Sequence, residues 1–310
     1  MNILFFGSTS DSVIVLEKLS ALSQVTIAAV VTQPARPVGR DQTITPTPVE
    51  TWATEQRIPV LSFASDKTKP WLYENEEQVI DALQPIQPDL VVSASYGQMI
   101  PASTIQGARY GGLNVHPSIL PRWRGGDPVP WAILSGDHQI GVTVVTLSPM
   151  FDAGEIYAQE KIPITPADTS DPLRTKLFGI GADLLCSLLP LYIAGKAKPI
   201  AVREEKEKPP YAKRLKREDG FEPWDTIAAA MSEGTDAERI ERKYRAFHPW
   251  PGLWTKITSV RGNTGALHDP KRLKLLALRI TNGRLVIEKV QLEGKNPVTW
   301  EQFSKSYLAS

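Results

Sequence analysis

Short apolar runs alternate with amphipathic segments through the first half of the chain, and this alternation restricts the fold more than any other feature. Residues 3–6 and 25–31 have the length and apolar content of buried strands. Between them, apolar residues recur at helical spacing over residues 11–22. Strands that alternate with helices form a mostly parallel sheet with helices on both faces. We therefore predict an α/β fold with a Rossmann-like sheet.

The same pattern continues to about residue 194. We expect further helices at residues 48–57, 76–83 and 171–194, and further strands at residues 89–93, 112–115 and 142–147. In sheets of this kind, ligands bind beyond the carboxyl ends of the strands. Functional side chains are therefore expected just after Phe6, Val31, Ser93, Val115 and Leu147.

The composition changes after residue 195. Residues 196–212 are polar, charged and contain proline, which is typical of an interdomain linker. A helical stretch at residues 236–247 is followed by β-type runs at residues 253–260, 273–280 and 285–291. Short strands with Gly and Asn turns favour a smaller C-terminal β-barrel of the OB-like type. We predict a catalytic domain at 1–195, a linker at 196–212 and a barrel domain at 213–310.

The net charge of +1 conceals an uneven distribution. Residues 1–212 contain 17 Lys and Arg against 22 Asp and Glu, whereas residues 213–310 contain 18 against 12. The C-terminal part therefore has a net charge of +6, which suggests a polyanionic partner. A mixed solvated surface would give the same count.

Cysteine and histidine usage excludes two classes of site. The single cysteine, Cys186, excludes a disulfide framework and fits a reducing compartment. The four histidines have no metal-ligand spacing, so we expect no metal. We see no signal peptide and no run near the roughly 20 apolar residues that cross a bilayer. These features predict a cytoplasmic protein.

Polar residues that can carry out chemistry cluster after the predicted strand at residues 112–115. Strand alternation places Asn114 and His116 on one side, where an amide and an imidazole can both bond a single oxygen. Acyl transfer needs such donors, because negative charge develops on the carbonyl oxygen. Asp152, after the strand ending near Leu147, could orient His116 or accept a proton. Ordinary turn roles for His116 and Asp152 remain the alternative.

These residues lie in motifs that resemble the folate-dependent formyltransferase family. The motifs are Asn114-Val115-His116, Ser118-Ile119-Leu120-Pro121, Arg124-Gly125, Gly141-Val142-Thr143 and Asp152-Ala153-Gly154, in that order. The resemblance implies that Asn114, His116 and Asp152 are catalytic and that the formyl donor is 10-formyltetrahydrofolate. It also implies a folate site lined by Ser118, Ile119, Leu120 and Pro121 on one side and by Tyr96, Gly97, Gln98 and Met99 on the other.

Three further segments, at residues 32–40, 211–215 and 245–252, resemble the group of this family whose acceptor is methionyl-tRNA. By analogy, Arg36 and Arg40 lie in a loop that approaches the acceptor end of the tRNA. The resemblance and the basic charge together assign phosphate contacts to Lys213, Arg214, Lys271 and Arg272. The chain departs from this group at Arg40-Asp41-Gln42-Thr43, where glycine and lysines are usual. This departure weakens the expected attraction of the loop to RNA.

The resemblance therefore predicts a monomeric cytoplasmic enzyme that formylates methionyl-tRNA for translation initiation. Three alternatives share some of these features. The first is a formyltransferase that acts on an amino-sugar nucleotide, which needs no basic domain. The second is a formyltetrahydrofolate hydrolase, in which water replaces the amine. The third is a basic RNA-binding module without catalytic activity.

Overall fold

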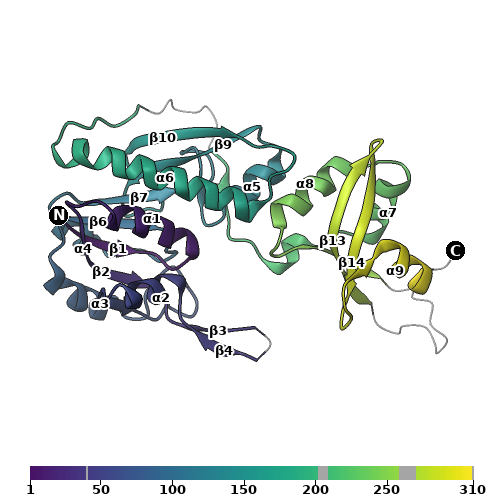
Figure 1. Cartoon of the computed structure of the whole chain (residues 1–310), viewed down its shortest axis with the longest axis horizontal. Coiled ribbons are helices and arrows are strands. Elements are labelled where there is room, and N and C mark those ends of the chain that lie inside the picture. The colour runs from purple at the N-terminus through teal and green to yellow at the C-terminus, as the bar shows by residue number, and fades with distance from the viewer. Residues whose placement is uncertain (40, 202–208, 258–269, 309–310) are drawn as a thin grey trace. The chain divides into compact units, whose positions relative to one another are not determined.

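The computed structural model describes residues 1–39, 41–201, 209–257 and 270–308 (Figure 1). The chain packs into two compact units. The N-terminal unit contains Met1–Pro128, Gln139–Pro163 and Arg174–Ala212, and the C-terminal unit contains Val129–His138, Ile164–Leu173 and Lys213–Ser310. Two short segments that precede residue 174 therefore belong to the C-terminal unit.

A seven-stranded sheet in the order β10-β9-β7-β6-β1-β2-β5 is the core of the N-terminal unit. Its parallel part consists of β1 (Asn2–Phe6), β2 (Thr26–Thr32), β5 (Val60–Ser62), β6 (Leu90–Ala94) and β7 (Gly112–His116). The strand β9 (Gln139–Thr146) is antiparallel to β7, and β10 (Ile156–Pro163) is antiparallel to β9. The prediction of a mostly parallel sheet is confirmed. The strands β5 and β10 were not predicted.

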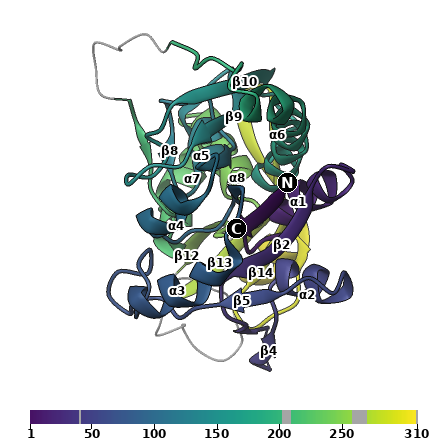
Figure 2. The ribbon, with the colours of Figure 1, turned by 90° about the vertical axis from the view of Figure 1, so that its left-hand side faces the viewer.

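Helices cover both faces of this sheet (Figures 1 and 2). On one face, α1 (Ser10–Ser20) is joined to α6 (Ser170–Ile193) by the ion pairs Asp11–Arg174 and Lys18–Asp183. The opposite face packs against α3 (Glu76–Leu83), whose Val79 and Leu83 share a buried cluster with Leu4 and Val91. The remaining helices of this unit are α2 (Pro48–Glu55), the 3-10 helix η1 (Gln84–Ile86) and α4 (Ala102–Gly107).

The helix α6 is long and apolar enough to cross a membrane, by length and composition. This differs from the expectation that no such segment exists. Gly181 of α6 lies so close to the sheet that a Cβ there would come within 2.6 Å of side-chain atoms of Val115 and Val142. Leu177 and Ala182 of α6 are fully buried. A core helix packed on a sheet can have the same length and the same apolar composition as a membrane-spanning helix.

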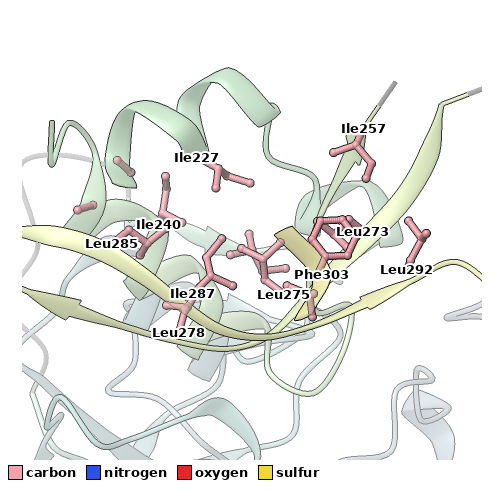
Figure 3. Close-up of a cluster of buried hydrophobic side chains, with 14 residues drawn as sticks. Ile227, Ile240, Ile257, Leu273, Leu275, Leu278, Leu285, Ile287, Leu292 and Phe303 are labelled. Atoms are coloured by element: carbon pink, nitrogen blue, oxygen red, sulfur yellow. The ribbon is translucent and has the colours of Figure 1, made fainter. Parts of the chain in front are cut away.

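The C-terminal unit is built on an antiparallel sheet in the order β12-β13-β14-β15. Its strands are β12 (Leu253–Ile257), β13 (Lys271–Thr281), β14 (Arg284–Leu292) and β15 (Val298–Thr299). The helices α7 (Trp224–Ser232), α8 (Ala237–Phe247) and α9 (Trp300–Tyr307) enclose a core between themselves and one face of the sheet. Figure 3 shows Ile227, Ile240 and Phe303 meeting Leu275 and Ile287 in this core. The predicted small C-terminal β-domain is confirmed as an antiparallel sheet, although α7 and α9 were not predicted.

Several short elements complete the described chain. They are the hairpin strands β3 (Arg36–Val38) and β4 (Thr43–Thr45), the paired strands β8 (Arg124–Gly125) and β11 (Tyr211–Ala212), the helix α5 (Pro128–Ser135) and the 3-10 helix η2 (Arg217–Gly220).

Candidate active site

The strand β7 presents Asn114 and His116 on one face of the sheet. Val115, between them, faces Gly181 of α6. Because strand side chains alternate, Asn114 and His116 point to the opposite face. His116 is 4% exposed, and Asn114 is partly exposed. The strand therefore presents an amide and an imidazole side by side near its carboxyl end.

Asp152 meets both side chains. Its Oδ1 accepts a hydrogen bond of 3.1 Å from Asn114 Nδ2 and lies 3.4 Å from His116 Nδ1. Its Oδ2 accepts a hydrogen bond of 3.1 Å from the backbone N–H of Gly125. The Asp152 side chain is only 8% exposed. The structure thus brings together three residues that are up to 38 positions apart in the sequence.

Asp152 reaches this place by a different route from the one expected. If β9 ran parallel to its neighbours, its carboxyl end would lie beside that of β7. Instead β9 is antiparallel to β7, with Leu113 opposite Thr146 and His116 opposite Thr143. The end of β9 therefore lies beside the start of β7. The connection from residue 147 to residue 155 folds back along β7 and carries Asp152 to Asn114 and His116.

Both ring nitrogens of His116 face oxygen acceptors. Nε2 lies 3.0 Å from the carbonyl oxygen of Trp123, which can only accept a hydrogen bond, so Nε2 is the donor. Nδ1 faces the carboxylate of Asp152. A neutral imidazole has one N–H, whereas the imidazolium cation has two. A proton on Nδ1 would therefore be directed at the carboxylate of Asp152.

Backbone strain is concentrated around these residues. Ser95, Trp123 and Asp152 all have left-handed φ angles, of 51°, 62° and 54°. Such a conformation costs a non-glycine residue on the order of 1–3 kcal/mol. Gly154 allows the Asp152 loop to close, because a Cβ there would lie 2.0 Å from the carbonyl oxygen of Thr146. Strain that the surrounding structure maintains is characteristic of functional sites.

The segment Ser118, Ile119, Leu120 and Pro121 is held in place by two side chains from the β9–β10 hairpin. The hydroxyl of Thr143 donates to Ser118 O at 2.6 Å and accepts from Leu120 N at 3.2 Å. Gln159 Nε2 donates both to Leu120 O and to the Thr143 hydroxyl, each at 2.9 Å. Thr143 and Gln159 are cross-strand partners. Sequence analysis gave neither a role at the site, because the clamp depends on the register between β9 and β10.

The loop after β6 contains the residues Tyr96, Gly97, Gln98 and Met99. The hydroxyl of Tyr96 is hydrogen-bonded to that of Tyr73 at 2.9 Å, and burial raises the pKa of both phenols well above 10. Gly97 has a φ of 85°, which favours glycine. The backbone N–H of Met99 donates to Trp71 O at 2.8 Å. This loop is therefore tied to the segment around residues 71–73.

Gln98 is the exception in this ordered loop. Its side chain is 2% exposed, yet neither Oε1 nor Nε2 has a hydrogen-bond partner within the residues that the structure describes. A buried amide without partners costs about 1–3 kcal/mol. An amide offers one acceptor and two donors, which matches the edge of a polar heterocycle. Within the described residues, the Gln98 amide therefore leaves these groups available to a ligand.

Of the two predicted RNA-contacting arginines, the structure describes Arg36, which lies in the β3–β4 hairpin. Arg36 is exposed at the start of β3, and its Nη2 donates to Gln33 Oε1 at 2.7 Å. Arg40 lies outside the described residues. Exposed apolar side chains occur on both strands, with Val38 56% and Ile44 63% exposed.

The four predicted basic residues of the C-terminal unit lie within the described residues and do not form one cluster. Lys213 Nζ lies 5.2 Å from the ring centroid of Trp131 and 3.5 Å from Asp219 Oδ1, so its charge is partly neutralised. Arg214 is exposed. Lys271 and Arg272 are consecutive in β13 and point to opposite faces of the sheet.

A basic patch forms on the face of the sheet that the helices leave uncovered. Arg272 lies directly opposite Lys256 of β12, and Lys274 lies opposite Trp254. Alternation places Lys274 on the same face as Arg272. Lys256 was missed in the sequence because its neighbour in space depends on strand register. We call Lys256, Arg272 and Lys274 the basic sheet patch.

No group of three or more His, Cys, Asp or Glu side chains suited to a metal ion occurs in the described ranges of the chain. The polar groups around Asp152 are an amide, an imidazole and a backbone N–H. Donors of this kind stabilise developing negative charge on an oxygen.

Comparisons with known proteins agree with this chemistry. Residues 1–189 match the family model described as formyl transferase. A methionyl-tRNA formyltransferase from Listeria welshimeri is 36% identical over 303 residues, which cover 93% of this chain and 89% of that protein. Another, from Roseiflexus castenholzii, is 35% identical over 311 residues, with 96% and 93% of the two chains covered.

Solved structures support the fold. A 4-N formyltransferase from Francisella tularensis has a TM-score of 0.58 and 16% identity, covering 82% of this chain and 91% of that chain. A sugar N-formyltransferase from a Shewanella species has a TM-score of 0.56 and 17% identity, covering 86% and 94%. At this level of identity the likeness shows a shared fold.

Proposed function

The chain belongs to the formyl transferase family, and we propose that it transfers the formyl group of 10-formyltetrahydrofolate to the free amino group of methionyl-tRNA. The observation that carries the proposal is that the Asp152 carboxylate contacts both Asn114 and His116. Similarity to methionyl-tRNA formyltransferases along nearly the whole chain supports methionyl-tRNA as the acceptor. The product is the formylated methionyl-tRNA used in translation initiation.

The formyl donor is held by two walls. Ser118, Ile119, Leu120 and Pro121 form one wall, which Thr143 and Gln159 fix in place. Tyr96, Gly97, Gln98 and Met99 form the other, in which the Gln98 amide takes its partners from the pterin ring. Both walls adjoin the strands β6 and β7, so the carrier binds at the edge where the Asn114 and His116 side chains project.

Catalysis depends on how the donors and acceptors of the three residues are distributed. One N–H of the Asn114 amide is bonded to Asp152, and the other donates to the formyl oxygen as it becomes negatively charged. The Nδ1–H of His116 contacts Asp152 loosely, at 3.4 Å, and is the second donor to this oxygen. Three of the roughly four acceptor sites of the Asp152 carboxylate are occupied. The remaining site accepts the proton of the amine, directly or through water.

The reaction balances without a further reagent. The neutral α-amine of the methionyl group forms a bond to the formyl carbon while Asn114 and His116 stabilise the oxygen. The amine loses a proton to Asp152, and the bond between the formyl carbon and the carrier nitrogen breaks. Asp152 passes the proton that it took from the amine to that nitrogen, directly or through water, and so returns to its ionised form. The products are the formylated amine and tetrahydrofolate.

The proposed division of labour follows the predicted domains. Residues 1–195 carry out the transfer, residues 196–212 link the domains, and residues 213–310 bind the tRNA backbone. Arg36 and Arg40 contact the acceptor end, and Arg214 with the basic sheet patch contacts phosphates. Lys213 and Lys271 contribute less, since Lys213 is paired with Asp219 and Lys271 lies on the helix-covered face. The protein acts as a cytoplasmic monomer.

An acceptor competition tests the proposal. The protein is incubated with labelled 10-formyltetrahydrofolate and, separately, methionyl-tRNA, an amino-sugar nucleotide or buffer alone. We expect the label in methionyl-tRNA. Label in the sugar nucleotide would support that alternative activity, and formate released in buffer alone would support a hydrolase. Salt-sensitive tRNA binding with no transfer would show an RNA-binding module.

A further inference from the structure

We propose that Arg124 and Tyr211 bind the terminal nucleotide of the acceptor RNA, Arg124 through its phosphate and Tyr211 through its base. The inference rests on the proposed methionyl-tRNA activity and adds a binding site to it. Neither residue takes part in the mechanism described above. Both belong to the N-terminal unit.

The backbone of Arg124 is fixed against the catalytic residues. The residue before it, Trp123, accepts a hydrogen bond from His116 Nε2 at 3.0 Å. The residue after it, Gly125, donates its N–H to Asp152 Oδ2 at 3.1 Å. A ligand of the Arg124 guanidinium therefore lies within one side-chain length of the reacting groups.

The Arg124 side chain lies beside the catalytic residues with one of its polar atoms unsatisfied. Its Nε is buried and has no hydrogen-bond partner in the part of the chain that the structure describes. Two other half-buried arginines each bind a carboxylate, Arg174 through Asp11 and Arg239 through Glu222. A buried charged donor without an acceptor is unfavourable. A bound anion next to Asp152 would supply the missing acceptor.

Tyr211 lies beside Arg124 and is 61% exposed. The two are register partners in the parallel pair of β8 and β11. The Tyr211 ring covers Gly125 so closely that a Cβ at that glycine would lie 2.7 Å from a ring atom. A fixed, exposed ring next to a cation is the combination with which proteins hold unpaired nucleotides, by stacking on the base and pairing with the phosphate.

The geometry of the acceptor favours this assignment. The reacting amine belongs to an aminoacyl group that is esterified to the ribose of the terminal nucleotide. When the amine is at Asp152, that nucleotide must lie next to the catalytic residues, where Arg124 and Tyr211 are found. A carboxylate of the folate carrier is the competing ligand for Arg124, and the experiment separates the two.

A cycle of enzyme and substrate changes tests the phosphate contact. Methionyl-tRNA is prepared with an ordinary phosphate or an uncharged methylphosphonate at the linkage before the terminal nucleotide. Arg124→Met is expected to lower kcat/KM for the ordinary substrate by about 10- to 100-fold. With the methylphosphonate the wild-type protein already loses this factor, and the substitution adds no further loss. Arg109→Met is the matched control, because Arg109 is exposed and precedes β7 at the opposite end of the strand.

A second pair of variants tests the stacking. Tyr211→Ala should lower kcat/KM for methionyl-tRNA by about 5- to 100-fold, and Tyr211→Phe should recover most of the loss because the ring is retained. Equal losses for Arg124→Met on both RNA substrates, or a rise in the KM for 10-formyltetrahydrofolate alone, would overturn the inference. Failure of the wild-type protein to formylate methionyl-tRNA would instead overturn the proposed function.

Discussion

Replacement of Asp152 by asparagine changes one atom at the centre of the site. The backbone should tolerate it, because asparagine adopts the left-handed conformation that Asp152 has, with φ of 54°. The side chain has the same shape. The carboxylate, however, accepts hydrogen bonds from Asn114 Nδ2 through Oδ1 and from Gly125 N through Oδ2, and Oδ1 also faces His116 Nδ1.

An amide cannot accept from both sides. If its oxygen faces Asn114 and His116, its NH₂ group faces the N–H of Gly125, which lies 3.1 Å from Oδ2. If the amide is flipped, its NH₂ group faces Asn114 and His116 instead. One donor is left opposing another donor in either orientation. We expect the free energy of unfolding to fall by about 1–3 kcal/mol.

The effect on turnover should be much larger. Asp152→Asn removes the proton acceptor and the anionic partner of His116, so kcat should fall by about 10²–10⁴-fold. The assay is formyl transfer to methionyl-tRNA at saturating donor and acceptor. Asp89→Asn is the matched control, since Asp89 accepts a hydrogen bond from Asn2 N at the amino end of the sheet. A variant that is folded, binds both substrates and turns over at the wild-type rate would refute the role given to Asp152.

Three further predictions concern the donor site and stability. Thr143→Val removes the hydroxyl that joins Ser118, Leu120 and Gln159, so the KM for 10-formyltetrahydrofolate should rise by about 5-fold or more. Thr143→Ser keeps a hydroxyl and should have a KM near the wild-type value in the same steady-state assay. Gln98→Leu removes the unpartnered buried amide, so chemical denaturation should show a gain of about 1 kcal/mol in the free energy of unfolding. Calorimetry should show weaker folate binding by this variant, and unchanged binding would contradict the role of Gln98. Burial raises the pKa of Glu222, but hydrogen bonds from Arg239 and Lys243 outweigh this effect and hold the pKa below 4.5. Because the folded-state pKa is depressed, the stabilisation is present above pH 4.5 and is lost as the pH falls through the folded-state pKa. Glu222→Gln should therefore reduce the loss of unfolding free energy at acid pH, and an unchanged acid profile would contradict this prediction.

Local sequence patterns were enough to predict the parallel sheet and the side on which Asn114 and His116 lie. Both follow from alternation along a single strand, which needs no knowledge of neighbouring strands. The residues that line the folate site were predicted from the resemblance of their motifs to those of the family. The roles of these residues stay predictions until variants are measured.

Features that depend on how strands pair could not be predicted in this way. The antiparallel direction of β9 determines how Asp152 reaches His116, and nothing in the run from Val142 to Leu147 specifies that direction. The clamp formed by Thr143 and Gln159 depends on the register between β9 and β10. Lys256 joins Arg272 across two strands. Each of these is a contact between segments whose pairing is decided by the packing of the whole sheet.

Within the described residues, the amide of Gln98 and the Nε atom of Arg124 lack hydrogen-bond partners, and this could not be predicted either. A glutamine or an arginine in a sequence gives no sign that its polar atoms will be buried without partners. In both cases, burial without an internal partner is what points to a ligand.

The central claim is that Asn114 and His116 stabilise the oxygen of the formyl group during transfer. Single-turnover transfer of labelled formyl to methionyl-tRNA, with enzyme in excess and both substrates bound, measures this step most directly. For Asn114→Ala and for His116→Ala the account predicts rates about 10²–10³-fold below wild type, with affinities for both substrates retained. Wild-type rates in both folded variants would contradict it.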